Sequence, residues 1–294
     1  MNHLLRVLAY LLRFGTVRIA NLLRPPKNGM CTRQMFGGTQ LLDLDRSITQ
    51  RLLFLDAERF VPERALLRDL VGPGDHVVDV GANIGYYALL FRQLGGPDAH
   101  LTLIEPSEEN LPELEATLEA NAFSEYTLHR CAVGRESGTV RIKRGINSGV
   151  TGADADGYDV PVRRLAELCE GPVDLIKIDV EGFEPEVVSG ALEMIDRTRP
   201  TIFLEVHPAL IARYGSSTVE TLAPLRERYD EFEVWRSIDL ARGPLLRRLL
   251  ARYGLAEPLF RIDDPARFVD TLEDTAHPET FWAVFHSQRS ATAA

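Results

Sequence analysis

The sequence has few cysteines: only Cys31, Cys131 and Cys169 occur among its 294 residues, and they are far apart and in no CxxC spacing. This number and spacing indicate neither a disulfide framework nor a thiolate zinc site. A chain without disulfides is typical of a reducing compartment. We therefore expect a cytoplasmic protein.

Long hydrophobic runs are also missing. The most apolar stretch near the start, residues 4–13, is interrupted by Arg6 and ends at Arg13, and no small-residue cleavage site follows it. A secretory signal needs such a site, and a membrane-spanning helix needs about 20 apolar residues. The sequence therefore predicts neither of these segments.

An excess of positive charge is absent from the chain as a whole, whose formal net charge is −10. Binding of nucleic acid without sequence preference requires a basic face, so we expect no nucleic-acid partner. The charge is uneven, however, because the first 42 residues hold six basic side chains and no acidic one. A basic arm thus precedes an acidic body.

The basic arm contains a predicted amphipathic helix over residues 2–23, with leucines on one face and Arg6 and Arg13 together on another. Two interpretations stay open. The helix packs on the core of the protein, or it makes a peripheral contact with an anionic membrane surface. We assign residues 1–57 to a basic helical extension. A second basic, leucine-rich segment at 245–252 lies within a predicted helical insertion over about 239–279.

From about residue 75 the sequence alternates between strand-like and helix-like blocks, which is typical of a mostly parallel sheet covered on both faces. The predicted strands are 76–80, 101–105, 127–133, 173–180 and 201–207, with closing strands at 232–235 and 281–285. Short strands at 139–143 and 158–162 flank an irregular loop. The sequence predicts one doubly wound α/β domain over residues 58–294.

The turn after the first of these strands has a spacing that suits a nucleotide. It reads Asp79-Val80-Gly81-Ala82-Asn83-Ile84-Gly85 and leads into a helix. Ligands of open α/β sheets bind at such turns. Asn83 stands where the dinucleotide fingerprint G-x-G-x-x-G needs its second glycine, so a pyrophosphate is disfavoured. Glu105, at the end of the next strand, is placed to accept ribose hydroxyls. A nucleoside without pyrophosphate fits S-adenosylmethionine better than NAD.

Four blocks carry a family resemblance: VVDVGANIGYYALL, LTLIEPSEENLPELEATLEAN, VDLIKIDVEGFEPEVVSGA and TIFLEVHP. In this order and spacing, over roughly residues 58–210, the chain resembles the FkbM-type methyltransferases. The resemblance implies a seven-stranded class I fold and S-adenosylmethionine as cofactor. It also implies that the methionine end of the cofactor lies among Asp79, Gly81, Asn83 and Gly85, that Glu105 holds the ribose, and that Cys131 and Ala132 border the adenine.

A second group of polar residues follows two strands on the acceptor side. Side chains alternate along a strand, so Asp179 and Glu181 share a face, as do Glu205 and His207. We expect these four residues in catalysis or acceptor binding. One alternative is a closed salt-bridge network, for instance of Lys177 with Asp179 or Glu205. The least favoured is a divalent cation held by Asp179, Glu205 and His207, so no metal site is predicted.

Transfer of a methyl group to a hydroxyl requires a base that removes the proton. His207 is the first candidate for this base because an imidazole titrates near neutral pH, and Asp179 is the second. Methyltransferases that act on amino groups of DNA or of protein glutamine show an Asn/Asp-Pro-Pro-Tyr/Phe segment, whereas this chain has Asp179-Val180-Glu181-Gly182. O-methylation is therefore favoured. From the resemblance alone, the acceptor is a small molecule, a glycan or a lipid-linked compound.

Two other functions compete with this hypothesis. The first is an NAD-dependent oxidoreductase, which the asparagine in the glycine turn disfavours. The second is a noncatalytic adaptor at a membrane surface, which keeps the nucleotide fold and acts through its basic helices.

Overall fold

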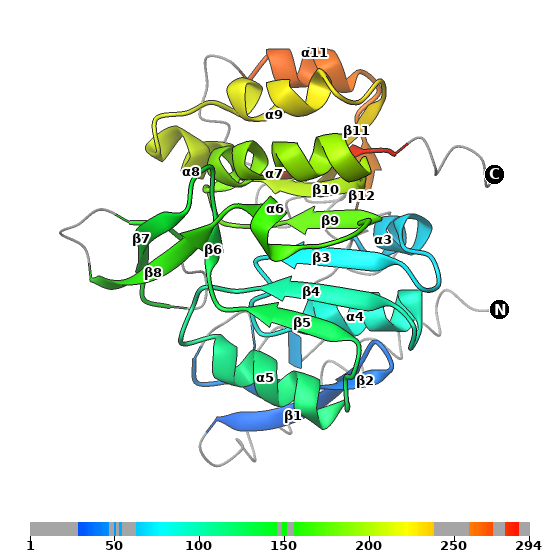
Figure 1. Ribbon diagram of the computed structural model, residues 1–294, viewed down its shortest axis with the longest axis vertical. Helices are drawn as coiled ribbons and strands as arrows, with labels where there is room; N and C mark the ends of the chain where they lie inside the picture. Colours follow the sequence, from blue (N-terminus) through cyan, green and yellow to red (C-terminus); the bar gives the residue numbers. More distant parts are fainter. Residues whose placement is uncertain are drawn as a thin grey trace, which may run out of the picture.

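The computed structural model describes residues 29–46, 50, 53–54, 63–145, 149–151, 156–237, 259–272 and 280–287. Its centre is an eight-stranded sheet with the order β12-β11-β13-β10-β9-β3-β4-β5 (Figure 1). The strands are β3 (His76–Val80), β4 (His100–Ile104), β5 (Tyr126–His129), β9 (Leu175–Ile178), β10 (Thr201–Val206), β11 (Phe232–Ser237), β12 (Leu259–Arg261) and β13 (Phe281–Phe285). The five strands from β10 to β5 are parallel, and the other three pair antiparallel.

The strand order reverses between β3 and β9. From β3 the chain proceeds outward through β4 to β5, and then returns to the other side of β3 to form β9 and β10. In a doubly wound sheet the carboxyl ends of the strands at such a reversal leave a crevice for a ligand. The topology therefore places the ends of β3, β4, β9 and β10 at the predicted site.

Helices cover both faces of the sheet because its strands are apolar on both sides. Ile176 and Ile178 belong to one core with apolar residues of α7 and α9, whereas Leu175 and Phe203 belong to a second core with residues of α4 and α5. The helices are α3 (Arg64–Leu70), α4 (Tyr86–Gly95), α5 (Leu111–Ala120), α6 (Leu165–Leu168), α7 (Glu184–Thr198), α8 (Pro208–Arg213), α9 (Thr218–Arg226) and α11 (Pro265–Asp270). The predicted alternation along β9 and β10 is confirmed.

The prediction of a single strand over residues 127–133 is wrong. β5 ends at His129, and Ala132–Val133 forms β6 in a separate three-stranded sheet with β7 (Gly138–Lys143) and β8 (Gly157–Arg163). Ala132 turns away from the main sheet because it packs with Ile142 and Val162 in a small core of its own. This small sheet lies beside the carboxyl ends of the main strands (Figure 1).

Residues 30–43 of the predicted helical extension form a β-hairpin, with the strands β1 (Met30–Met35) and β2 (Gly38–Asp43). Its two-residue turn has positive φ at Phe36 and Gly37, as the tight turns of hairpins require. The hairpin is attached to α5, since Asn121 Oδ1 accepts from the backbone N–H of Thr39 at 2.7 Å. The predicted helix over 2–23 lies outside the described residues.

The predicted insertion over about 239–279 supplies β12 and α11, so the sheet has eight strands instead of the expected seven. The additional strand pairs with β11 through Trp235 and Arg261 at the edge of the sheet. Within the described residues no helix is long and apolar enough to cross a membrane.

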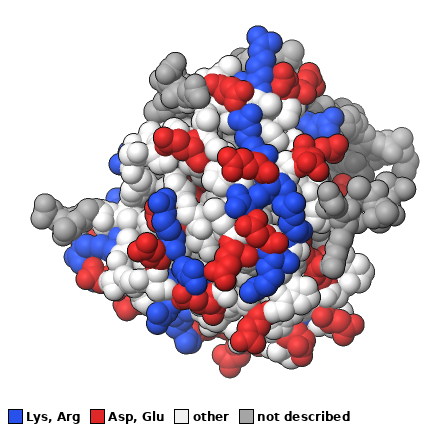
Figure 2. All heavy atoms as spheres, turned by 45° about the horizontal axis from the view of Figure 1, so that its top comes forward, with Lys and Arg blue, Asp and Glu red and all other residues white. Residues whose placement is uncertain are grey.

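The face formed by α7, α9 and α11 carries both charge signs in alternation (Figure 2). Ion pairs such as Arg226 with Asp270 at 2.7 Å and Arg228 with Asp196 at 2.8 Å join basic and acidic side chains there. Exposed pairs of this kind contribute little to stability. They place acidic side chains between the basic side chains of this face.

Candidate active site

The loop between β3 and α4 approaches the end of β9 closely at Gly81. This residue has a φ of +88°, and a Cβ on it would lie 1.9 Å from the carbonyl oxygen of Asp179. Only glycine combines this backbone conformation with such a contact. The loop therefore lies directly on the strand end that carries Asp179.

Glu105, at the end of β4, holds the same loop from the other side. Its carboxylate accepts the backbone N–H of Asn83 at 2.8 Å and that of Ser107 at 2.9 Å, and also the side-chain amide of Asn110 at 3.2 Å. Burial raises the pKa of Glu105 to about 7, although these hydrogen bonds oppose the rise. Glu105 thus fixes the loop in addition to its predicted contact with a ribose.

A cleft of about 640 Å³, partly open to solvent, lies between the glycine loop, the end of β9 and the small sheet. Seven of the predicted site residues line it: Gly81, Asn83, Glu105, Cys131, Ala132, Asp179 and Glu181. Gly85 is not among the lining residues; a Cβ there would lie 2.7 Å from Leu114. Glu205 and His207 are not among the lining residues either.

Asp79 does not reach the cleft. Its side chain is completely buried and accepts from Lys177 Nζ at 3.0 Å, whereas Asp179 lies 3.7 Å from the same nitrogen. Asp79 on β3 and Lys177 on β9 are direct neighbours across the two strands. Burial lowers the pKa of Lys177, but the charges of Asp79 and Asp179 outweigh it and raise the pKa. Asp79 therefore pairs with the lysine under the loop, which the sequence analysis did not foresee.

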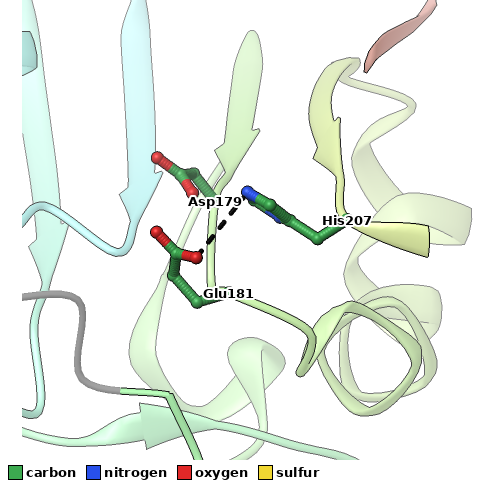
Figure 3. Close-up of side chains that lie close together, drawn as sticks. All are labelled: Asp179, Glu181 and His207. Carbon is green, nitrogen blue, oxygen red and sulfur yellow. Dashed lines mark ion pairs between the residues drawn. The ribbon is translucent and has the colours of Figure 1, made fainter. Parts of the chain in front are cut away.

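Asp179, Glu181 and His207 converge at the end of the cleft (Figure 3). Single ligand atoms of the three side chains lie within 4.8 Å of one another. His207 follows β10 and directs Nε2 toward the carboxylates, 3.9 Å from Glu181 and 3.7 Å from Glu205. The structure thus brings the four predicted acceptor-side residues together.

Glu184 is a further member of this group. It is the first residue of α7, it is completely buried, and its Oε1 lies 2.7 Å from His207 Nδ1. The same oxygen accepts the backbone N–H of Gly182 at 3.1 Å. The sequence gives one signal for it, an acidic residue at the start of a helix, which usually marks a favourable interaction with the helix dipole. That signal does not indicate contact with a histidine on the next strand.

The electrostatics of His207 are set by these carboxylates. Burial lowers the pKa of its imidazole, but the hydrogen bond to Glu184 and the charges of Glu184, Glu205 and Asp179 outweigh it and raise the pKa to about 10. Burial and the charge of Asp179 raise the pKa of Glu205 well above the usual range. The carboxylates thus favour the protonated form of the imidazole, whereas burial favours the neutral form of Glu205.

Comparison with known proteins identifies the family. Residues 79–232 match the methyltransferase FkbM domain. The chain is 30% identical over 226 residues to the 31-O-demethyl-FK506 methyltransferase FkbM of Streptomyces tacrolimicus. The match covers 58% of this chain and 84% of that protein.

Two solved structures are also similar. A methyltransferase FkbM from Methylobacillus flagellatus KT has 16% identity and a TM-score of 0.42 over 81% of this chain, which spans about half (54%) of that protein. An S-adenosylmethionine-dependent O-methyltransferase from Thermotoga maritima has 16% identity and a TM-score of 0.42, with 77% of this chain and 65% of that one covered. On the domain match and the curated relative, the chain belongs to the FkbM methyltransferase family and is an S-adenosylmethionine-dependent enzyme.

Proposed function

We propose that this methyltransferase methylates a hydroxyl oxygen of a small molecule, a glycan or a lipid-linked compound. The observation that carries the proposal is the group of carboxylates around His207 at the end of the cleft, because a hydroxyl acceptor must lose a proton. The name of the Streptomyces relative, which specifies an O-demethyl substrate, supports the same chemistry. We propose no nucleic-acid acceptor, since the net charge is −10.

The lining of the cleft suits S-adenosylmethionine. Apolar residues, among them Ile104, Val133 and Ile142, line it together with the carboxylate of Glu105, a combination that suits an aromatic base joined to a ribose. Gly81 and Asn83 would hold the amino-acid end. When bound, the cofactor supplies a methyl group activated by its sulfonium.

The hydroxyl proton goes to the carboxylates in this proposal, not to His207. Asp179 and Glu181 line the cleft, so they are the groups that a hydroxyl can reach. Glu205 lies behind them, with a pKa raised by burial and by Asp179. Glu184, Glu205 and Asp179 surround His207 and raise the pKa of its imidazole, which favours the protonated form. Its positive charge offsets part of the negative charge of the group, so we replace the expected general base by a charge-balancing role.

The competing functions make different predictions about the site. Asn83 and the position of Gly85 do not match a pyrophosphate loop, and family membership favours methyl transfer over hydride transfer. An adaptor at a membrane surface would need no proton-accepting group at the end of the cleft. The group of carboxylates around His207 therefore favours a catalytic site.

The test uses matched pairs of acceptors that differ only in one hydroxyl or amino group, presented with methyl-labelled S-adenosylmethionine. We expect label in the hydroxyl members only, with the methyl carbon attached to oxygen by NMR. Asp179→Asn should lower the rate of transfer, whereas His286→Ala serves as a control, because His286 follows the end of β13 and pairs with Glu233 at 3.6 Å. A methyl group on nitrogen or carbon would refute the proposal.

A further inference from the structure

We propose that Asp179, Glu181 and His207 form a binding site for a divalent cation of the Mg²⁺ or Mn²⁺ type. The three side chains follow the ends of two neighbouring strands, β9 and β10, and they lie close together (Figure 3). The set differs from the one considered from the sequence, because Glu181 takes the place of Glu205.

The spacing of the ligand atoms suits one ion. Ligand atoms about 2.1 Å from an octahedral ion lie about 3 Å apart when adjacent and about 4.2 Å apart when opposite. His207 Nε2 and Glu181 Oε2 are 3.9 Å apart, and all three ligand atoms lie within 4.8 Å. Small side-chain rotations bring the widest pair into range. Asp179 and Glu181 have room for them, since 22% and 30% of their side chains are exposed.

His207 gives an independent indication of a ligand. Its side chain is nine-tenths buried, and Nε2 lies 3.7 Å from Glu205 and 3.9 Å from Glu181, beyond hydrogen-bond distance from both. Nδ1 is held by the buried carboxylate of Glu184 at 2.7 Å. Histidines that bind metals usually donate their other ring N–H to such a carboxylate, which orients the ring. The ring is thus fixed with Nε2 directed between carboxylates.

The charge around the site also favours a cation. The carboxylates of Asp179, Glu181, Glu184 and Glu205 surround His207, and the nearby Lys177 has its shortest contact with Asp79. Two carboxylates and one imidazole are ligands that Mn²⁺ and Mg²⁺ accept, and none of the three is a thiolate, which softer metals prefer.

The consequence for catalysis rests on the proposed function, whereas the binding itself does not. A cation at this end of the cleft holds the oxygen of an acceptor hydroxyl and makes its proton easier to remove. Glu205 is not one of the three ligands, and its Oε1 lies 3.7 Å from His207 Nε2, so it is a nearby oxygen to which the proton can go.

Direct binding of Mn²⁺ to the full-length protein tests the proposal. We would follow the EPR signal of free Mn²⁺ without cofactor or acceptor, and expect one bound ion per chain. The double variant Asp179→Asn, Glu181→Gln should weaken binding at least a hundredfold. Glu184→Gln should weaken it about tenfold to hundredfold, as for other residues that orient a metal ligand. Glu193→Gln, an exposed residue of α7 that pairs with Arg164, should bind as the wild type does.

Nitrogen coupling in the pulsed EPR spectrum of bound Mn²⁺ should disappear in His207→Gln. Binding that is absent at millimolar Mn²⁺, or that the double variant retains, would overturn the inference, provided that the circular dichroism spectra of the variants match the wild type. The outcomes separate the two proposals. A methyl ether formed by a protein that binds no Mn²⁺ overturns only the cation site, and Mn²⁺ bound by a protein that methylates nitrogen overturns only the O-methylation.

Discussion

Glu184 Oε1 lies 2.7 Å from His207 Nδ1 and joins the start of α7 to the end of β10. A buried carboxylate in this position fixes both the ring orientation and the nitrogen that carries the proton. His207, which does not line the cleft, thus depends for its orientation on a second residue that does not line it. Glu184 is accordingly a positioning residue.

Glu184→Gln should lower kcat about tenfold to hundredfold, because the amide weakens the hold on the ring, while the KM for S-adenosylmethionine stays the same. Glu184→Asp should restore part of the rate. The control is Glu186→Gln, in the same turn of α7, where the side chain is 39% exposed and pairs with Arg135. A purely structural role would instead lower stability in proportion to activity, and thermal unfolding of each variant would reveal this.

Glu105→Ala should weaken binding of S-adenosylhomocysteine by about 1.5–3 kcal/mol, the usual range for lost hydrogen bonds to a charged group. The structure adds a second expectation, since the same carboxylate holds the backbone N–H groups of Asn83 and Ser107. The variant should therefore also melt at a lower temperature. Titration calorimetry and thermal unfolding measure the two effects, with the exposed Glu108→Ala as control. Unchanged affinity would contradict the assignment of Glu105 to the ribose.

The sheet and its central site were predictable because their signals are local. Runs such as Ile202–Leu204 are apolar on both faces, as is typical of strands in a covered parallel sheet, and a glycine turn after the first strand marks the ligand edge. The side-chain alternation of two strands then sufficed to bring Asp179 and His207 to one place. Each of these inferences needed only a few consecutive residues.

What the sequence did not reveal depends on contacts between distant segments. The partner of Lys177 is Asp79, which is 98 positions away and becomes its neighbour only when β3 pairs with β9. Glu184 meets His207 across 23 positions for the same kind of reason. The edge strand β12 is three residues long, too short to give a period, and it exists only because β11 offers it hydrogen-bonding partners.

Gly81→Ala tests the close approach of the loop to β9. A Cβ would lie 1.9 Å from the Asp179 carbonyl oxygen at a φ of +88°, so the loop must shift and cofactor affinity should fall at least tenfold. Gly74→Ala is a matched control, because Gly74 has a similar φ of +78° with no atom within 4 Å of the added Cβ. The control should lose only about 1–2 kcal/mol of stability from the backbone conformation. Equal losses in both variants would show that the contact with Asp179 is unimportant.

The buried carboxyl of Glu63 should make stability depend on pH. It accepts the hydroxyl of Tyr87, and burial raises its pKa from 4.5 to about 7, opposed by that hydrogen bond and by Lys177 and reinforced by Asp179. Between these two values the folded state binds more protons than the unfolded state, so the stabilisation present below pH 4.5 is lost as the pH rises to 7. One pKa unit corresponds to about 1.4 kcal/mol, and the loss should be on the order of 2–4 kcal/mol.

The variant Glu63→Gln tests this, because it retains an acceptor for Tyr87 and cannot ionise. We would measure the free energy of unfolding of both proteins in urea from pH 4.5 to 8. The difference in favour of the variant should grow as the pH rises, whereas a difference that stays constant with pH would show that Glu63 ionises normally.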